Sequence, residues 1–231
     1  MNIRKISYFS LFVAGAIAFA GCKSSSTSPN GSTAVVIPNA GSYFVIVNLH
    51  LDSTGAIVES DTTVETFVAT GLYFAGKTNV VEVIDSSNGY VTNTGYYHYE
   101  SDGDVSVFGN YITGAPTWTT YPFGSQQPQP INGDTTANGV SESYALTISG
   151  AGSGSSSIAG KGFSTEKITV DGKIIVSESG ITDTVTGNFG TEAFAPSLGE
   201  LVDETTPAIR NPISHALGTS FHEFLISYML K

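Results

Sequence analysis

The sequence predicts an all-β fold, an antiparallel meander curled into a curved sheet or half-barrel with a few short helical turns. Short runs rich in Val, Ile, Thr, Tyr and Phe alternate two sets of side chains, as in Tyr43 to Leu49, which is the period of a β-strand. Turn signals that combine Gly with Asn or Asp separate these runs. Only 13% of the residues are charged and 11% are aromatic. This balance is typical of extracellular β proteins and differs from that of a helical bundle.

The predicted strands follow one another from Tyr43 to the C-terminus, and no helical period lasts more than about two turns. Turns are expected at Asp52 to Gly55, Ser87 to Gly89, Asp102 to Asp104 and Asp171-Gly172, so the strands flanking each turn should be antiparallel neighbours. The strands cover Tyr43 to Leu51, Ile57 to Thr70, Leu72 to Ile84, Tyr90 to Glu100, Asp104 to Ile112, Ser143 to Ser149, Ser156 to Phe163, Lys167 to Val170, Lys173 to Ser179, Thr182 to Thr186, Glu192 to Ala195 and Phe221 to Leu230.

Three segments between the strands are predicted to be connections. Pro116 to Gly139 contains four prolines and reads as a long surface loop. Ser197 to Gly218 reads as a second loop that includes a short helical turn. Ser149 to Ser157 is rich in Gly and Ser, but it lacks the Gly-x-Gly-x-x-Gly and Gly-Lys-Ser/Thr patterns of phosphate-binding loops, so we interpret it as a flexible hairpin connection.

The N-terminus has the pattern of an export signal. Arg4 and Lys5 precede an apolar run from Ser7 to Phe19, which is shorter than the roughly 20 residues that span a bilayer as a helix. The run closes with Phe19-Ala20-Gly21-Cys22. This ending resembles the signals of bacterial lipoproteins, although Phe19 stands where Leu is usual. The resemblance implies that Cys22 is lipidated and becomes the new N-terminus; the alternative is an ordinary secretory signal with an incidental cysteine.

The expected organisation is a signal peptide over residues 1–21, a lipidated N-terminus and flexible tether over 22–41, and a single all-β domain over 42–231. The tether is rich in Ser, Thr, Asn and Pro and buries little apolar area. The lipid places the protein in the bacterial cell envelope, attached to a membrane that it does not span. Lys23, rather than Asp, follows the cysteine, which favours the outer membrane.

Charge and cysteine content exclude several functions. Removal of Arg4 and Lys5 with the signal leaves 7 basic and 20 acidic side chains, a net charge of −13. Such a chain repels nucleic acid and anionic lipid headgroups, so the lipid itself is the expected membrane attachment. Cys22 is the only cysteine, which leaves no thiol for a disulfide, a metal site or a nucleophile.

Catalytic and metal-binding motifs are not apparent, and we expect no enzyme activity, no metal and no cofactor. No Gly-x-Ser-x-Gly elbow and no His-x-His or His-x-x-x-His spacing occurs. His98 and Glu100 lie on one face of a predicted strand, where they either orient one another or make a surface contact. Asp102-Gly103-Asp104 lacks the later oxygen ligands of a calcium loop, which favours a hairpin turn.

An aromatic cluster provides the candidate ligand-binding residues, Trp118, Tyr121 and Phe123. Such side chains beside a Pro- and Gln-rich segment can stack on a sugar or cap an apolar cavity. They can also fasten the loop to the core, and both interpretations remain open.

The C-terminal part of the chain resembles the ending of many uncharacterised bacterial envelope lipoproteins. Phe194 to Val202 reads Phe-Ala-Pro-Ser-Leu-Gly-Glu-Leu-Val, and Glu223 to Tyr228 follows after a gap. The family tail is approximately Phe-Ala-Pro-Gly-x-Gly-Leu-Val-Lys, then Glu-Leu-x-x-Tyr. Ser197 replaces the first family Gly, and Glu200 interrupts the apolar step. The resemblance implies an antiparallel half-barrel similar to lipoprotein carriers of the envelope, with no catalytic residues to transfer.

The leading hypothesis is therefore a lipid-anchored, non-enzymatic envelope protein whose curved sheet is structural or binds an apolar or glycan ligand. No protein partner can be assigned. The second hypothesis is a surface hydrolase or carbohydrate-active enzyme, which requires two Asp or Glu side chains that converge in the fold. The third is an adhesion or assembly subunit with exposed edge strands.

Overall fold

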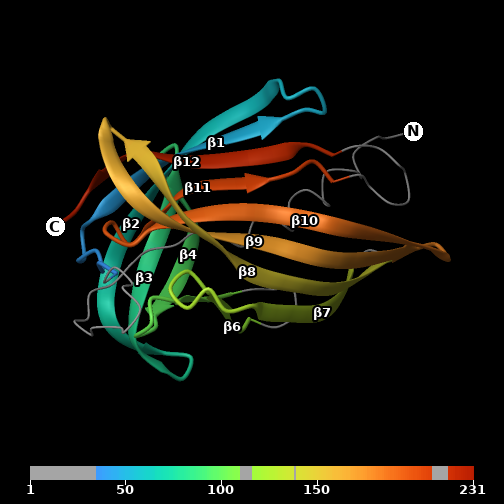
Figure 1. Cartoon of the computed structure of the whole chain (residues 1–231), viewed down its shortest axis with the longest axis horizontal. Coiled ribbons are helices and arrows are strands. Elements are labelled where there is room, and N and C mark those ends of the chain that lie inside the picture. Colours follow the sequence, from blue (N-terminus) through green and yellow to red (C-terminus); the bar gives the residue numbers. More distant parts are fainter. Residues whose placement is uncertain (1–34, 110–115, 138, 210–217) are drawn as a thin grey trace.

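The computed structural model describes residues 35–109, 116–137, 139–209 and 218–231, so Cys22, the signal peptide and most of the tether lie outside the described residues. The described part forms one antiparallel sheet and contains no helix, which confirms the predicted all-β class (Figure 1). The strands are β1 (Tyr43–Leu51), β2 (Ile57–Phe74), β3 (Lys77–Ser87), β4 (Tyr90–Tyr99), β5 (Val105–Phe108), β6 (Trp118–Tyr121), β7 (Gln129–Ala137), β8 (Val140–Ile158), β9 (Lys161–Glu178), β10 (Ile181–Ala195), β11 (Glu200–Thr206) and β12 (Ser220–Met229).

The strands form an antiparallel meander whose sheet curves so that its two edges approach each other. Its order is β6-β5-β4-β3-β2-β1-β12-β11-β10-β9-β8-β7, so β1 and β12 are the one neighbouring pair that is not consecutive in sequence. The first and last strands therefore pair in the middle of the sheet, while the edge strands β6 and β7 lie near each other. No helix in the described ranges is long and apolar enough to cross a membrane.

Tight turns join most neighbouring strands. In the β3–β4 hairpin, Asn88 and Gly89 have φ angles of 52° and 80°. Positive φ at both positions gives the turn whose twist matches that of the flanking strands. Ala75-Gly76, Ala159-Gly160 and Ser179-Gly180 repeat this geometry and close the β2–β3, β8–β9 and β9–β10 hairpins. The predicted turn at Asp171-Gly172 is wrong, because this pair lies within β9 and pairs with β8 and β10.

The two predicted long loops contain strands. Pro116 to Gly139 holds the edge strands β6 and β7, and Pro130 is tolerated in β7 because an edge strand leaves one side of its backbone unpaired. Ser197 to Gly218 holds β11, which lies between β10 and β12. The predicted loops were wrong here because tertiary pairing, rather than local composition, determines whether such segments are extended.

The Gly- and Ser-rich segment from Ser149 to Ser157 is not a flexible connection but part of β8. It pairs with β9 and carries a register shift between Gly150 and Gly152. Gly150 permits close packing, because a Cβ there would lie 2.2 Å from Oε1 of Gln126. Beyond this shift the β8–β9 hairpin arches toward β12 (Figure 1). There the ring of Phe163 meets that of Tyr228 edge-on, with the ring centres 5.7 Å apart.

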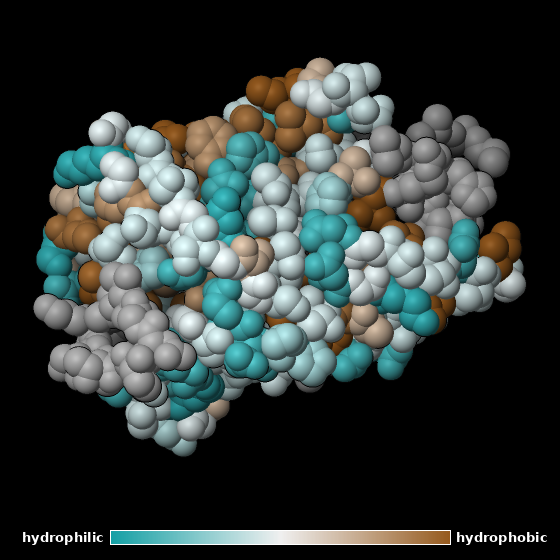
Figure 2. Space-filling view, in the orientation of Figure 1, coloured by the Kyte–Doolittle hydropathy of each residue, from teal (hydrophilic) through white to brown (hydrophobic). Residues whose placement is uncertain are grey.

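The main hydrophobic core lies on the concave side of the sheet. Phe44 and Phe67 pack edge to face at 5.6 Å, and Phe123 stacks on Phe194 at 4.9 Å. Phe44, Ile46 and Asn48 alternate inward along β1, as the period of two predicts. Across the view in Figure 2 the surface is mostly hydrophilic or neutral, with hydrophobic residues in separate small groups.

Candidate functional site

Three glutamates lie in one row across adjacent strands on the concave face. Glu192 of β10 is directly opposite Glu204 of β11, and Glu204 is directly opposite Glu223 of β12. Side chains at directly opposite positions have Cβ atoms about 4.5–5.5 Å apart, and like charges there destabilise the sheet. We call these three residues the glutamate row. The row continues to Asn48 of β1 and Asp61 of β2.

Three further acids face the same interior. Glu65 of β2 is opposite Phe44 of β1 on one side and Asp85 of β3 on the other, and Glu200 begins β11. Glu65 and Glu200 have no exposed surface, while Glu192, Glu204 and Asp85 are also buried and Glu223 is partly buried. We call the six residues the interior acids: Glu65, Asp85, Glu192, Glu200, Glu204 and Glu223.

Most interior acids have carboxyl oxygens without hydrogen-bond partners. Both oxygens of Glu65 and of Glu192 lack a partner, as does one oxygen each of Asp85, Glu200 and Glu204. Glu200 and Glu65 contact one another through their carboxyl groups, and this contact raises the pKa of Glu65 and lowers that of Glu200. Some partners are present: Asn93 Nδ2 donates to Asp85 at 3.0 Å, the backbone N–H of Leu201 donates to Glu200 at 2.9 Å, and the Thr206 hydroxyl donates to Glu204.

Burial shifts the titration of this cluster strongly. Desolvation, followed by the charges of neighbouring acids, raises the pKa of Glu65 and of Glu204 well above the usual value. Desolvation also raises the pKa of Glu192 and of Glu223 to about 8, with smaller contributions from nearby carboxylates. The pKa of Glu200 is likewise raised, mainly by burial. Several interior acids therefore hold protons at neutral pH and can both donate and accept hydrogen bonds.

Two buried tyrosines face the interior acids. Burial raises the pKa of Tyr97, and the charges of Glu65 and Asp85 raise it further. Burial raises the pKa of Tyr121 in the same way, with the charge of Glu192 next in size. The interior thus combines carboxyl groups with phenol rings, a pairing that suits polar ligands with some apolar surface.

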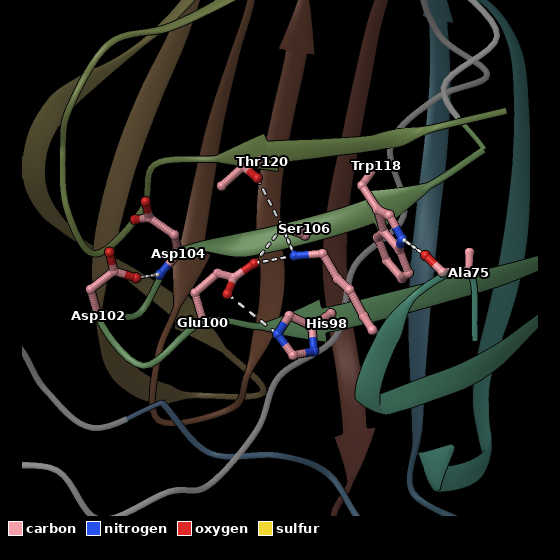
Figure 3. Close-up of polar contacts among 9 residues, drawn as sticks. Ala75, His98, Glu100, Asp102, Asp104, Ser106, Trp118 and Thr120 are labelled. Carbon is pink, nitrogen blue, oxygen red and sulfur yellow. Dashed lines mark hydrogen bonds and ion pairs between the residues drawn. The ribbon is translucent and has the colours of Figure 1, made fainter. Parts of the chain in front are cut away.

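A second polar network lies on the opposite face of β4, β5 and β6 (Figure 3). Ser106 Oγ donates to Glu100 Oε1 at 2.8 Å, Lys77 forms an ion pair with the same carboxylate, and His98 Nε2 lies 3.3 Å from Glu100 Oε2. The predicted contact between His98 and Glu100 is therefore present. Burial alone would raise the pKa of Glu100, but the hydrogen bonds from Lys77 and Ser106 outweigh it and lower the pKa.

This second network has a structural role. Ser106 is fully buried, and its hydroxyl donates its hydrogen bond to the Glu100 carboxylate rather than to a histidine. Trp118 Nε1 donates to the backbone oxygen of Ala75 at 2.9 Å, at the tip of the β2–β3 hairpin (Figure 3). The network fastens that hairpin tip to β4, β5 and β6 and does not have the arrangement of a nucleophile with its base.

The structure separates the three predicted ligand-binding residues. Trp118 lies on the outer face, where Lys77 Nζ is 5.4 Å from its ring centre. Tyr121 and Phe123 are only 3% and 1% exposed and belong to the core. Of the three, Tyr121 faces the interior acids, and Phe123 packs against Phe194. The aromatic cluster is therefore not one surface.

Sequence reasoning missed the interior acids, although two signals were present. Glu200 interrupts an apolar step, and it is fully buried. The second signal is the position of Glu223 next to His222, because neighbouring strand residues face opposite ways: His222 Nε2 lies 3.1 Å from Asp203 Oδ2, whereas Glu223 joins the glutamate row. The alignment of the three glutamates across β10, β11 and β12 depends on strand register, which no local sequence pattern reveals.

The Asp102 to Asp104 segment is a hairpin turn, as predicted. The carboxylate of Asp104 accepts hydrogen bonds from the backbone N–H groups of Gly124 and Ser125 at 3.0 and 2.7 Å. Asp104 therefore anchors the segment that follows β6. Within the part of the chain that the structure describes, no group of three His, Cys, Asp or Glu side chains has the geometry to hold a metal ion.

The described residues define a protein built as a curled antiparallel sheet with acids on its concave face. No family model matches the chain, and no curated protein matches it. A solved structure of a protein provisionally called a lipoprotein, from Parabacteroides distasonis ATCC 8503, is similar with a TM-score of 0.51 and 11% identity, over 83% of this chain and 96% of that one. This likeness shows a shared fold.

A second solved structure has a lower score. It is a provisionally named exported protein with a YmcC-like fold from Bacteroides fragilis NCTC 9343, with a TM-score of 0.40 and 12% identity, over 85% of this chain and 100% of that one.

Proposed function

We propose that the protein is a non-enzymatic envelope protein, anchored by lipid at Cys22, whose interior acids bind a glycan. The unpartnered carboxyl oxygens carry the proposal. A buried polar atom without a partner costs about 1–3 kcal/mol, and buried polar groups in native proteins are almost always satisfied by protein, water or ligand. Seven such oxygens belong to five of the interior acids, Glu65, Asp85, Glu192, Glu200 and Glu204.

A glycan matches the chemistry of these groups better than an apolar ligand does. Sugar hydroxyls donate and accept hydrogen bonds, as do protonated carboxyls and tyrosine hydroxyls. Tyr97 and Tyr121 add aromatic rings beside the acids. An apolar molecule would leave the carboxyl oxygens without partners, and the desolvation cost would remain.

The envelope location is supported by the N-terminal signal pattern and by the fold shared with the Parabacteroides protein. Lys23 after the lipidated cysteine favours the outer membrane. The negative charge of the mature chain supports attachment through the lipid rather than through contact with anionic headgroups.

A hydrolase that uses Asp and Glu is the second candidate, because the required convergence of acids is present. Glycoside hydrolysis needs one protonated and one ionised carboxyl group on either side of the bond. Burial raises the pKa of all five interior glutamates, which disfavours the ionised partner that hydrolysis needs. Binding without turnover is therefore the better account.

Calorimetry on the purified lipidated protein in detergent tests the proposal. We expect heat of binding from oligosaccharides and no release of shorter products over hours of incubation. Glu204→Gln removes the middle of the glutamate row and should weaken binding, whereas Glu178→Gln should not. Glu178 is exposed and lies about 30 Å along β9 from Ile168, the partner of Glu192. Product release would favour the hydrolase, and absence of oligosaccharide binding would reject the proposal.

A further inference from the structure

We infer that the ligand of the interior acids is cationic, bearing protonated primary amines, and that its binding releases protons from the glutamate row. The inference rests on the proposed function, because it names the ligand class for the same site. It predicts an amine-bearing glycan, and it predicts that a simple polyamine occupies the site as well.

When the glutamate row ionises, its geometry brings three negative charges close together, and a nearby positive charge would stabilise them. Glu192, Glu204 and Glu223 occupy directly opposite positions on three adjacent strands, which lie about 4.8 Å apart. Three carboxylates in such a row repel one another strongly in a buried setting. A cation placed along the row would remove the repulsion and supply donors to the oxygens that lack partners.

Among the residues that the structure describes, no basic side chain pairs with the row. The ion pairs found in the described ranges engage Glu100 and Asp203, and none involves an interior acid. The mature chain has a net charge of −13, which attracts cations and repels anions. The described residues also lack a three-ligand group suited to a metal ion. An organic cation with several ammonium groups along its length therefore fits this linear row.

The row also has a path to solvent. Asp61, at the β2 end, is exposed, and Asn48 Nδ2 donates to Asp61 Oδ1 at 2.6 Å and to Thr63 Oγ1 at 2.9 Å. Asn48 and Glu204 are buried on either side of the partly buried Glu223, so the exposed groups nearest the row are those of Asp61 and Glu223. An amine can therefore meet the row at Asp61 and at the partly buried Glu223, with the amide of Asn48 between them.

Proton release follows from the state of the row before binding. The pKa of Glu192 and of Glu223 is raised to about 8, chiefly by burial, so both hold protons at pH 7. An adjacent ammonium favours the carboxylate form and lowers these pKa values. Binding must then expel protons, and the affinity for an amine that stays charged must rise between pH 6 and pH 8.

A matched pair of glycans and one polyamine test the inference on the lipidated protein in detergent. The β-1,4-linked glucosamine tetramer carries amines, its N-acetylated counterpart has the same skeleton without charge, and spermidine carries amines without sugar. We expect the N-acetylated tetramer to bind about tenfold more weakly than the amine form. Titration of spermidine in phosphate and in Tris should show a heat difference that corresponds to released protons.

The variants and outcomes separate this inference from the proposed function. Glu204→Gln should weaken spermidine binding about tenfold and reduce proton release, and Glu178→Gln should change neither. Equal binding of the two tetramers without proton release would overturn the cation inference and leave glycan binding intact. Spermidine binding without binding of either tetramer would uphold the cation and reject the glycan. No binding of any of the three would reject both.

Discussion

Replacement of Glu192 by Gln should flatten the dependence of stability on pH. Glu192 is 1% exposed, both its oxygens lack partners, and burial raises its pKa from 4.5 to about 8. The folded state therefore holds this proton more tightly than the unfolded state does. The stabilising effect is complete below pH 4.5 and is lost as the pH rises to about 8.

The expected size follows from the width of that window. Each pKa unit corresponds to about 1.36 kcal/mol, so Glu192 alone removes up to about 5 kcal/mol of unfolding free energy between pH 4.5 and pH 8. Between pH 5 and pH 7 its contribution is about 2–3 kcal/mol. The other interior acids act in the same direction, because their pKa values are also raised.

Urea denaturation at pH 5, 6, 7 and 8 measures the effect. The unmodified protein should lose stability over this range, and Glu192→Gln should lose less of it, by up to about 1.36 kcal/mol per pH unit. The buried amide of Gln adds a constant cost that does not depend on pH. Glu178→Gln, at an exposed position, should keep the original slope. A Glu192→Gln slope equal to that of the unmodified protein would refute the reasoning.

Three further changes test other parts of the molecule. Lys77→Met should cost about 1 kcal/mol, since its ion pair with Glu100 is partly exposed, and should alter the fluorescence of the nearby Trp118, the single tryptophan; unchanged emission would count against the contact. Gly124→Ala should cost about 1–3 kcal/mol in urea denaturation, because its Cβ would lie 2.0 Å from the backbone oxygen of Asp102, whereas Gly162→Ala, with open space, should be nearly neutral. Cys22→Ser should leave the protein unlipidated by mass spectrometry and in the soluble fraction of a membrane preparation; a membrane-bound Ser variant would contradict the anchor.

The hairpins show what the sequence can predict and where it fails. Tyr43 to Leu51 matches β1 because a period of two and flanking turn residues agree over nine residues. The turn at Ala75-Gly76 was missed, and Leu72 was assigned to the following strand. Ala is unusual at positive φ, yet it adopts 46° at this position because the pairing of β2 with β3 determines the turn.

Composition misled the prediction where tertiary pairing outweighs propensity. Ser149 to Ser157 would be a poor strand in isolation, but β9 pairs with it on both sides of the register shift between Gly150 and Gly152. Gly150 also leaves room for the side chain of Gln126. β7 is extended despite Pro130 because it is an edge strand. In both cases the partner strand, distant from the local pattern, provides the stabilisation.

The interior acids could not be predicted for a different physical reason. Glu192, Glu204 and Glu223 are separated by 11 and 18 intervening residues, and no spacing or motif in the sequence links one to another. A shift of one residue in either strand pairing would turn a glutamate to the outer face and dissolve the row. The bulge between Ala193 and Phe194 of β10 adjusts that register immediately beside Glu192. Buried like charges at opposite positions destabilise a sheet, so the alignment of the three glutamates lowers the stability of the fold when they ionise. A bound cation would offset that loss of stability. This connects the strand register to the proposed ligand.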